Sequence, residues 1–578
     1  MNQHLVTDNV RARPVRSSGF AFAPVCQLAQ HCQLAGTATL DSIDTQKLLP
    51  SVPLGRQTLQ VRSLGYAPRL LPNVLVQSGQ ETVLEVALRE AVLTGDEVVV
   101  RAAARDGQPL NDMAAVSARS FSVEESRRYA GAVDDPARLA AAFPGVAATG
   151  TGVSDNALAI RGNAPRGVLW RLEGVEIPTP SHFAGLSVAG GGGQTLFSSQ
   201  LLADSDVFTG AFPAEYGNAL SGVFDMRFRT GNPARREHTA QVGLLGLEFA
   251  SEGPFQRGAP STYLVNYRYS TLGLLMPLLP TDGATTYQDL SFKLAFPTRR
   301  AGRVEVWGSG GLDGQTLAET PDSSAWEFDF WDRTRMDLTL GVGAAGVSHH
   351  LVLGDRAYLR TSAAVTAQRT VWDQQRLADD LSLRPDFALR STNGRASLGA
   401  TLTHKLSPRH VSQSGVSVQQ MVYDLDLRAA PDHVPPLVSV AEGDGSSTLV
   451  QAFTRSRLTP ARGLDLTLGL HAQRLALTGH TAVEPRLGLT WAASDRQEVR
   501  LGYGLHSQIE DLRIYLVQPD GTAQPNRDLD AARAHHLVVG TTRRLSETLR
   551  VGVEGYVQRL FDVPVVAGAG SNDTRSAV

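Results

Sequence analysis

From about Arg236 onward, apolar and polar residues alternate in one segment after another, and this period of two most constrains how the chain folds. The segments around Leu398, Leu468, Leu501 and Val553 each show it. A period of two places alternate side chains on opposite faces of a sheet. One such segment would suit a half-buried strand of a soluble protein. Many in succession, about 10 residues each, favour a transmembrane antiparallel β-barrel with apolar side chains toward lipid and polar ones toward the lumen.

The number of alternating segments is smaller than a plugged barrel requires. About 14 strands are countable, whereas plugged outer-membrane transporters have about 22. We therefore expect a mainly β chain whose residues 233–578 form an incomplete, partial barrel. An open sheet would leave backbone hydrogen-bonding groups unsatisfied in lipid, which makes the missing strands a real structural difficulty.

Composition excludes other classes of protein. Hydrophobic residues make up 42% and charged residues 19% of the chain, and no run of about 20 apolar residues marks a membrane-spanning helix. A net charge of −3 gives no reason to expect nucleic-acid binding. The two cysteines, Cys26 and Cys32, suit an exported protein without a disulfide framework, whether they are bridged or unpaired.

The first part of the chain is organised differently. Residues 1–34 show no sustained periodicity and are expected to be a disordered or degenerate leader. Short alternating runs separated by Gly and Pro predict a small β-sandwich over residues 35–92, followed by a linker over 93–110. Residues 111–232 mix helix and strand signals and predict an α+β domain.

Local signals place elements within residues 111–232. Ser122 can cap one short helix, and Asp134 or Asp135 with Pro136 can begin a second. The runs 168–170 and 223–227 are the strongest strand candidates.

Three blocks of sequence follow in a fixed order in this domain. They contain Ile160, Arg161 and Gly162; then Glu173, Gly174 and Val175; then Pro213, Glu215, Tyr216, Gly217 and Gly222. In that order and at that spacing they resemble the plug domain of TonB-dependent outer-membrane receptors. The resemblance implies that residues 111–232 plug the barrel that follows, and that the protein lies in the outer membrane of a Gram-negative bacterium.

Two further segments extend the resemblance. Residues 52–88 resemble an incomplete carboxypeptidase-regulatory-like domain, an accessory module often placed ahead of the plug and without catalytic activity. Glu97, Val98, Val99 and Val100 resemble a TonB box, which would pair with a periplasmic energy transducer by adding a strand to a sheet edge. The alternative is that these four residues form the last strand of the preceding sandwich.

Arg161 and Glu173 raise specific structural expectations. An arginine buried in a polar lumen needs a carboxylate partner, and Glu215 or Glu173 would supply one. The alternative is a solvated surface arginine. Glu173 stands where the family more often has Asp before Gly, and Asp closes such a turn better.

Candidate ligand contacts come from the plug and from one long loop. The resemblance implies a pocket formed by plug apices and outer loops, here represented by Thr179, His182, Phe183, Trp326, Phe328 and Trp331. The aromatic residues of the loop suit stacking on a ring-bearing ligand, and an interfacial aromatic girdle is the alternative.

No motif indicates an enzyme, a metal site or a cofactor. The adjacent histidines His349 and His350, like His535 and His536, point to opposite faces of a strand and cannot share one metal. The glycine run 190–193 lacks the Gly-Lys-Ser/Thr of a phosphate-binding loop.

The resemblance therefore implies a TonB-dependent receptor and transporter for a scarce nutrient, either chelated iron or another small ligand. Its partners would be a TonB-type periplasmic energy transducer, outer-membrane lipid and a small extracellular ligand, with no nucleic acid. The alternatives are a non-transporting surface-binding or adhesive β-barrel protein and a non-functional receptor fragment.

Overall fold

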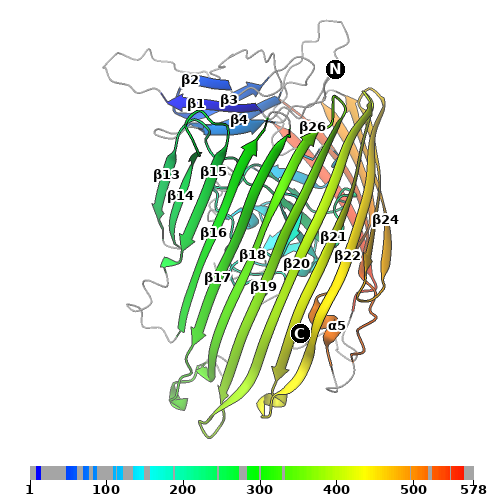
Figure 1. Cartoon of the computed structure of the whole chain (residues 1–578). Coiled ribbons are helices and arrows are strands. Elements are labelled where there is room, and N and C mark those ends of the chain that lie inside the picture. The colour runs from blue at the N-terminus through cyan, green and yellow to red at the C-terminus, as the bar shows by residue number, and fades with distance from the viewer. Residues whose placement is uncertain are drawn as a thin grey trace, which may run out of the picture.

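The computed structural model describes residues 8–14, 47–61, 69–76, 82–86, 109–111, 113–121, 135–148, 156–185, 189–243, 246–271, 283–298, 301–327, 332–494, 496–518, 524–546 and 549–564. These residues form a long curved sheet, a smaller mixed domain within its curve, and small sheets at one end (Figure 1). No helix among them is long and apolar enough to cross a membrane.

The long sheet has 15 strands, each antiparallel to the next along the chain. They are β13 (Glu237–Val242), β14 (Leu247–Pro254), β15 (Thr262–Tyr269), β16 (Gly283–Pro297), β17 (Arg303–Leu317), β18 (Thr334–Val352), β19 (Ala357–Leu377), β20 (Leu383–Ser407), β21 (His410–Ala429), β22 (Val438–Ala461), β23 (Leu464–Leu475), β24 (Thr481–Ser494), β25 (Gln497–Gln508), β26 (Ala532–Arg544) and β27 (Arg550–Phe561). The expected antiparallel fold is confirmed, with one strand more than the expected 14. Within the described part of the chain, β13 and β27 do not pair with each other.

The two faces of this sheet differ as the alternation predicts. Val365, Leu398 and Val553 on the outer face are 60%, 65% and 66% exposed. Asn266 and Glu484 on the inner face are fully buried. An apolar outer belt around a polar interior is the arrangement that a lipid-embedded barrel requires.

The two ends of the sheet also differ. At the end where β1 to β4 lie, the turns are short: β20 ends at Ser407 and β21 begins at His410 (Figure 1). At the other end the connections are longer, and one of them carries α5 (Leu512–Leu516). Two others carry the short 3₁₀ helices η4 (Ser323–Ala325) and η5 (Pro431–His433). Short turns on one side and long loops on the other are typical of outer-membrane barrels.

The mixed domain, called the plug below, lies inside the curve of the long sheet (Figure 1). Its elements are β6 (Ala118–Phe121), α2 (Pro136–Ala140), β7 (Val146–Ala148), β8 (Leu158–Ile160), η2 (Pro165–Gly167), β9 (Val168–Leu172), β10 (Val175–Ile177), β11 (Ser205–Phe208) and β12 (Gly222–Met226). Its main sheet has the order β10-β9-β12-β11-β6, with β9 and β12 parallel. The predicted strands 168–170 and 223–227 thus correspond to β9 and β12, although β12 ends at Met226.

Of the two predicted starts of α2, Asp134 and Asp135, the structure has Asp135 as the capping residue. The Asp135 carboxylate accepts hydrogen bonds from the backbone N–H groups of Ala137 and Arg138, and Pro136 occupies the first helical turn. The other predicted helix start, Ser122, lies outside the described residues.

The plug has an apolar core that continues into the wall. Trp170 of β9 stacks on Phe224 of β12 with ring centroids 4.3 Å apart. Ile160, also in this cluster, is fully buried. Leu264 of β15 and Trp307 of β17 belong to the same cluster, so plug and wall share one dry interior on this side.

The N-terminal part forms two small sheets. One joins β1 (Asp8–Pro14), β2 (Lys47–Val52) and β5 (Thr82–Val86), and the other pairs β3 (Gly55–Val61) with β4 (Arg69–Val76). The strand β1 falls within residues 1–34, where a disordered or degenerate leader and no strand was expected. The TonB-box-like residues Glu97 to Val100 lie outside the described residues.

Candidate functional site

The turn at Glu173 and Gly174 joins β9 to β10 and points into the wall. Both residues have positive φ, 50° and 77°, as a two-residue hairpin turn of this kind requires. The longer side chain of Glu173 accepts a hydrogen bond from the Phe228 backbone N–H at 2.8 Å and pairs with Lys293 Nζ of β16 at 2.9 Å. Glutamate at this position therefore forms part of the turn and also contacts the wall.

Arg161 is buried and charge-paired, but its partner was not foreseen. Its side chain is 2% exposed, and its guanidinium donates to the Glu554 carboxylate of β27 and to Ser117 Oγ at 2.7 Å. The guanidinium also lies over the Tyr556 ring, 4.2 Å from its centroid. The expectation of Glu215 or Glu173 as partner is wrong, because both carboxylates are held by basic residues of the wall.

On the β14 to β17 side, carboxylates of the wall receive donors from the plug. Glu252 of β14 accepts two hydrogen bonds from the Arg229 guanidinium, each 2.6 Å, and a third from the Asn232 backbone N–H at 2.8 Å. Glu248 of the same strand accepts one from Ser198 Oγ. Bidentate pairing of this kind fixes orientation as well as adding energy.

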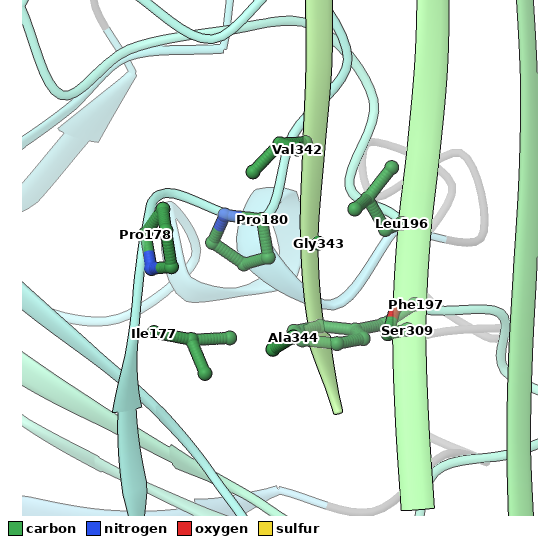
Figure 2. Close-up of a pocket in the computed structure, with 9 residues that line it drawn as sticks. All are labelled: Ile177, Pro178, Pro180, Leu196, Phe197, Ser309, Val342, Gly343 and Ala344. Carbon is green, nitrogen blue, oxygen red and sulfur yellow. The ribbon is translucent and has the colours of Figure 1, made fainter. Parts of the chain in front are cut away.

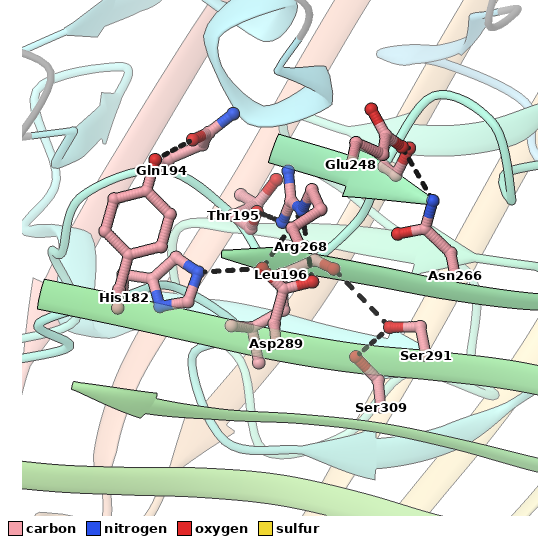
Figure 3. Close-up of polar contacts among 12 residues, drawn as sticks. His182, Gln194, Thr195, Leu196, Glu248, Asn266, Arg268, Asp289, Ser291 and Ser309 are labelled. Carbon is pink, nitrogen blue, oxygen red and sulfur yellow. Dashed lines mark hydrogen bonds and ion pairs between the residues drawn. The ribbon is translucent and has the colours of Figure 1, made fainter. Parts of the chain in front are cut away.

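The plug apex is fastened to the same side of the wall through His182. One ring nitrogen lies 3.0 Å from Asp289 Oδ2 of β16 (Figure 3). The other lies 2.5 Å from Asp313 Oδ1 of β17. The Phe183 backbone N–H donates to Asp313 at 2.7 Å, and Arg268 of β15 donates to both oxygens of Asp289 at 3.0 Å. Burial alone would lower the pKa of His182, but its hydrogen bonds with the two carboxylates raise it.

On the β19 to β24 side the signs are reversed, because arginines of the wall hold acceptors of the plug. Arg395 of β20 pairs with Glu176 at 2.6 Å, and Arg455 of β22 pairs with Glu215 at 2.9 Å. Arg360 of β19 donates to the Glu173 backbone carbonyl, and Arg486 of β24 donates to that of Tyr216 at 3.4 Å. These four residues are called the wall arginines below.

Plug carboxylates on this side are stabilised in their charged form. Burial alone would raise the pKa of Glu176, but Arg395 and the side-chain amides of Asn218 and Gln419 more than offset this effect and lower that pKa. Asp225 of β12 behaves alike: burial alone would raise its pKa, but the charges of Arg171 and Arg227 more than offset burial and lower that pKa.

The third sequence block packs tightly between these groups. The Tyr216 hydroxyl donates to Asp225 at 2.9 Å, and its ring is fully buried. A Cβ at Gly217 would lie 2.0 Å from His471 Nε2 of β23, and one at Gly222 would lie 2.7 Å from the Phe208 carbonyl oxygen. Glycine at both positions is therefore required by close approach of neighbouring groups.

The predicted ligand candidates separate into different environments. His182 and Phe183 are buried against the wall, whereas Thr179 is partly exposed. Trp326 follows η4 and donates to the Thr320 carbonyl at 2.7 Å, and Phe328 and Trp331 lie outside the described residues.

A narrow apolar cavity lies between plug and wall just beyond this apex. Its lining residues are Ile177, Pro178, Pro180, Leu196, Phe197, Ser309, Val342, Gly343 and Ala344 (Figure 2). No charged side chain lines it. In the described part of the chain, no group of three or more His, Cys, Asp or Glu residues is arranged to hold a metal ion.

Comparison with solved structures identifies the architecture. A mutant of the ferric enterobactin receptor PfeA of Pseudomonas aeruginosa matches with a TM-score of 0.55 and 14% identity, over 77% of this chain and 71% of the receptor. The siderophore receptor PirA of Acinetobacter baumannii matches with a TM-score of 0.57 and 14% identity, over 77% of this chain and 71% of that receptor. The chain has the fold of a plugged outer-membrane receptor. The outer membrane transporter YddB of Escherichia coli shares this receptor fold, with a TM-score of 0.55, 11% identity, and 76% and 69% coverage of the two chains.

No protein-family model matches the sequence, and no curated protein matches it either.

The wall arginines were not among the site residues that the sequence predicted. For Arg395, which belongs to the alternating segment around Leu398, the alternation predicts only that its side chain points inward. The alternation of the strand shows which residues point inward. It does not show which group of the plug each inward residue contacts.

Proposed function

We propose that this protein is a TonB-dependent outer-membrane receptor that takes up a chelated iron compound or another scarce small nutrient. The observation that carries the proposal is a plug seated inside a curved sheet with an apolar outer face and a polar inner face. Many charged contacts join the plug to the wall, as expected for a plug that closes the barrel and rearranges during transport. The receptor fold it shares with siderophore receptors supports the choice of ligand class.

The ligand would enter at the end of the sheet with the long connections. Thr179, His182 and Phe183 at the plug apex, together with the loop residues Trp326, Phe328 and Trp331, would contact it there. Because His182 and Phe183 are buried against the wall, a ligand would reach them only after the apex shifts.

Energy would come from a periplasmic transducer that pairs with Glu97 to Val100. A run of three valines in extended conformation offers backbone donors and acceptors to an exposed strand edge. Residues 35–92 would form an accessory domain, residues 93–110 the linker, residues 111–232 the plug and residues 233–578 the barrel.

Two measurements test this function. Membrane fractionation should find the protein in the outer membrane, and cells that express it should accumulate iron from a panel of labelled ferric chelates beginning with ferric enterobactin. Val98→Pro should abolish accumulation because proline removes a backbone donor. Val98→Thr keeps the donor and should preserve it. Equal uptake by the two variants would contradict the energy coupling, and outer-membrane protein without uptake of any solute would favour the surface-binding alternative.

A further inference from the structure

The inner wall of the barrel is electrically polarised where it meets the plug. On β14, β16 and β17 most of the wall groups that hold the plug are carboxylates, those of Glu248, Glu252, Asp289 and Asp313. Lys293 of β16 is the basic exception on this side, because it pairs with Glu173 of the plug. On β19, β20, β22 and β24 it is held by the wall arginines. The plug complements each side, with Arg229 and His182 toward the acidic wall and Glu176 and Glu215 toward the basic wall.

The two sides also differ in how well buried polar atoms are satisfied. Of the described residues on β14 to β18, only the side-chain oxygen of Asn266 is buried without a hydrogen-bond partner. On β19 to β24 the corresponding atoms are Trp372 Nε1, Ser397 Oγ, Gln419 Oε1, Ser447 Oγ, His471 Nε2, Gln473 Oε1 and Arg486 Nε. Buried polar atoms require water or a solute when the protein offers no partner. The basic side is therefore the hydrophilic side.

The acidic side, in contrast, is sealed by apolar packing. Leu264 and Trp307 of the wall share a core cluster with the plug, and the cavity next to Ser309 is lined by apolar side chains (Figure 2). Separating plug from wall here would expose apolar surface and break buried ion pairs at once.

The plug segments on the basic side are the easier ones to detach. Glu176 lies in β10, which is the edge strand of the plug sheet and pairs with β9 through three residues. Glu215 lies in the connection between β11 and β12, outside any strand. Movement of these segments would uncover Arg395 and Arg455, and it would also shift the buried side chains beside them, Val175, Ile177 and Tyr216.

We propose that the solute crosses between the plug and β19 to β24, and that it is an anion whose carboxylate or phosphate groups replace Glu176 and Glu215 on the wall arginines. The proposal rests on the transport function proposed above. Guanidinium groups match carboxylates and phosphates in bidentate geometry, and rings of arginine are the usual lining of anion-selective pores. In the closed state the plug carboxylates occupy the places of the solute and neutralise the basic wall.

Thiol labelling of the purified full chain in lipid vesicles tests the route without needing a ligand. Ser397→Cys on the basic side and Ser309→Cys on the acidic side form a matched pair, because both serines are 7% exposed and face the plug. Each is made in a Cys26→Ser, Cys32→Ser background. The probes are an anionic sulfonate and a cationic trimethylammonium methanethiosulfonate, each rate being normalised to that of a free thiol.

The basic side should open more readily and concentrate anions. Ser397→Cys should react about tenfold faster with the anionic than with the cationic reagent, since a charged cleft raises local counter-ion concentration by about that factor or more. Ser309→Cys should react slowly with both. Adding Arg395→Gln and Arg455→Gln should remove the anion preference of Ser397→Cys. Melting curves of both cysteine variants verify that they are folded.

Other results would overturn the route. Faster labelling of Ser309→Cys, or a cationic preference at Ser397→Cys, would do so even if the receptor still accumulates ferric chelates. Conversely, loss of uptake with the predicted labelling pattern intact would count against the transport function and not against the basic passage. In cells that take up a chelate, the anionic reagent should block uptake through Ser397→Cys and spare Ser309→Cys.

Discussion

Arg395 Nη1 and Glu176 Oε1 lie 2.6 Å apart, although 219 residues separate them along the chain. The contact joins the wall strand β20 to the edge strand of the plug sheet. Their side chains are 23% and 12% exposed, so the pair is mostly withdrawn from water. Glu176 also accepts a hydrogen bond from Asn218 at 2.9 Å, which ties a second plug segment to the same carboxylate.

Removing this arginine should loosen the plug. We expect Arg395→Gln to destabilise plug seating by about 2–3 kcal/mol, because it leaves a partly buried carboxylate without its charged partner. Urea unfolding of the protein in detergent would measure the change.

Arg390 supplies the matched control on the same strand. It pairs with Asp373 at 2.6 Å, but both side chains are about half exposed, at 47% and 52%. Arg390→Gln should cost about 0–1 kcal/mol, as exposed ion pairs usually do. Equal effects of the two substitutions would argue against the plug–wall role of Arg395.

The plug apex should be held more firmly at low pH. The raised pKa of His182 means that its stabilising contribution is fully present below the unfolded value of about 6.5 and is lost as pH rises through the folded pKa. The free energy of local opening at 179–185, measured by hydrogen exchange and corrected for intrinsic rates, should fall over that range. His182→Gln should flatten the dependence, and its difference from the native protein should vanish at high pH. A difference that grows with pH would contradict a protonated His182.

The outer face of β20 should tolerate charge only near the loops. Leu398 is 65% exposed within the apolar belt, so Leu398→Arg should cost about 2–4 kcal/mol of folding in lipid. Thr392 lies on the same face and nearer the loop end, and Thr392→Arg should cost about 0–1 kcal/mol. The free energies of folding of the two variants would be measured by refolding into lipid vesicles at a series of denaturant concentrations. Equal losses for the two variants would contradict the placement of the apolar belt at Leu398.

Adding a side chain at Gly217 should destabilise the protein unless the neighbouring wall residue is made smaller. The added Cβ of Gly217→Ala would lie 2.0 Å from His471 Nε2 and 2.8 Å from Gln451 Oε1, a clash that typically costs about 1–3 kcal/mol. Shortening the neighbour in Gly217→Ala/His471→Ala should recover part of this loss. Gly555→Ala on β27, where nothing lies within 4 Å, is the neutral control. The melting temperatures of the three variants in detergent would measure these effects. An unchanged melting temperature for Gly217→Ala would contradict the close packing.

Local sequence signals predicted several elements correctly for simple reasons. The Asp135-Pro136 pair supplies both a capping carboxylate and a preset backbone angle, so α2 begins where expected. The alternation around Leu398 settles which side chains face outward, because strand geometry leaves only two faces. The apex residues His182 and Phe183 were predicted as ligand contacts, but their burial against Asp313 and Asp289 depends on strands more than 100 residues away.

The sequence by itself determined the alternation, the turn positions and the order of the plug blocks, because each depends on residues close together in the chain. Only the tertiary structure decided that Glu554 is the partner of Arg161, 393 residues distant, and that most wall groups holding the plug are carboxylates on β14 to β17 and arginines on β19 to β24. The physical reason is that strand parity fixes whether a side chain points inward. Curvature of the sheet and seating of the plug fix what it meets there.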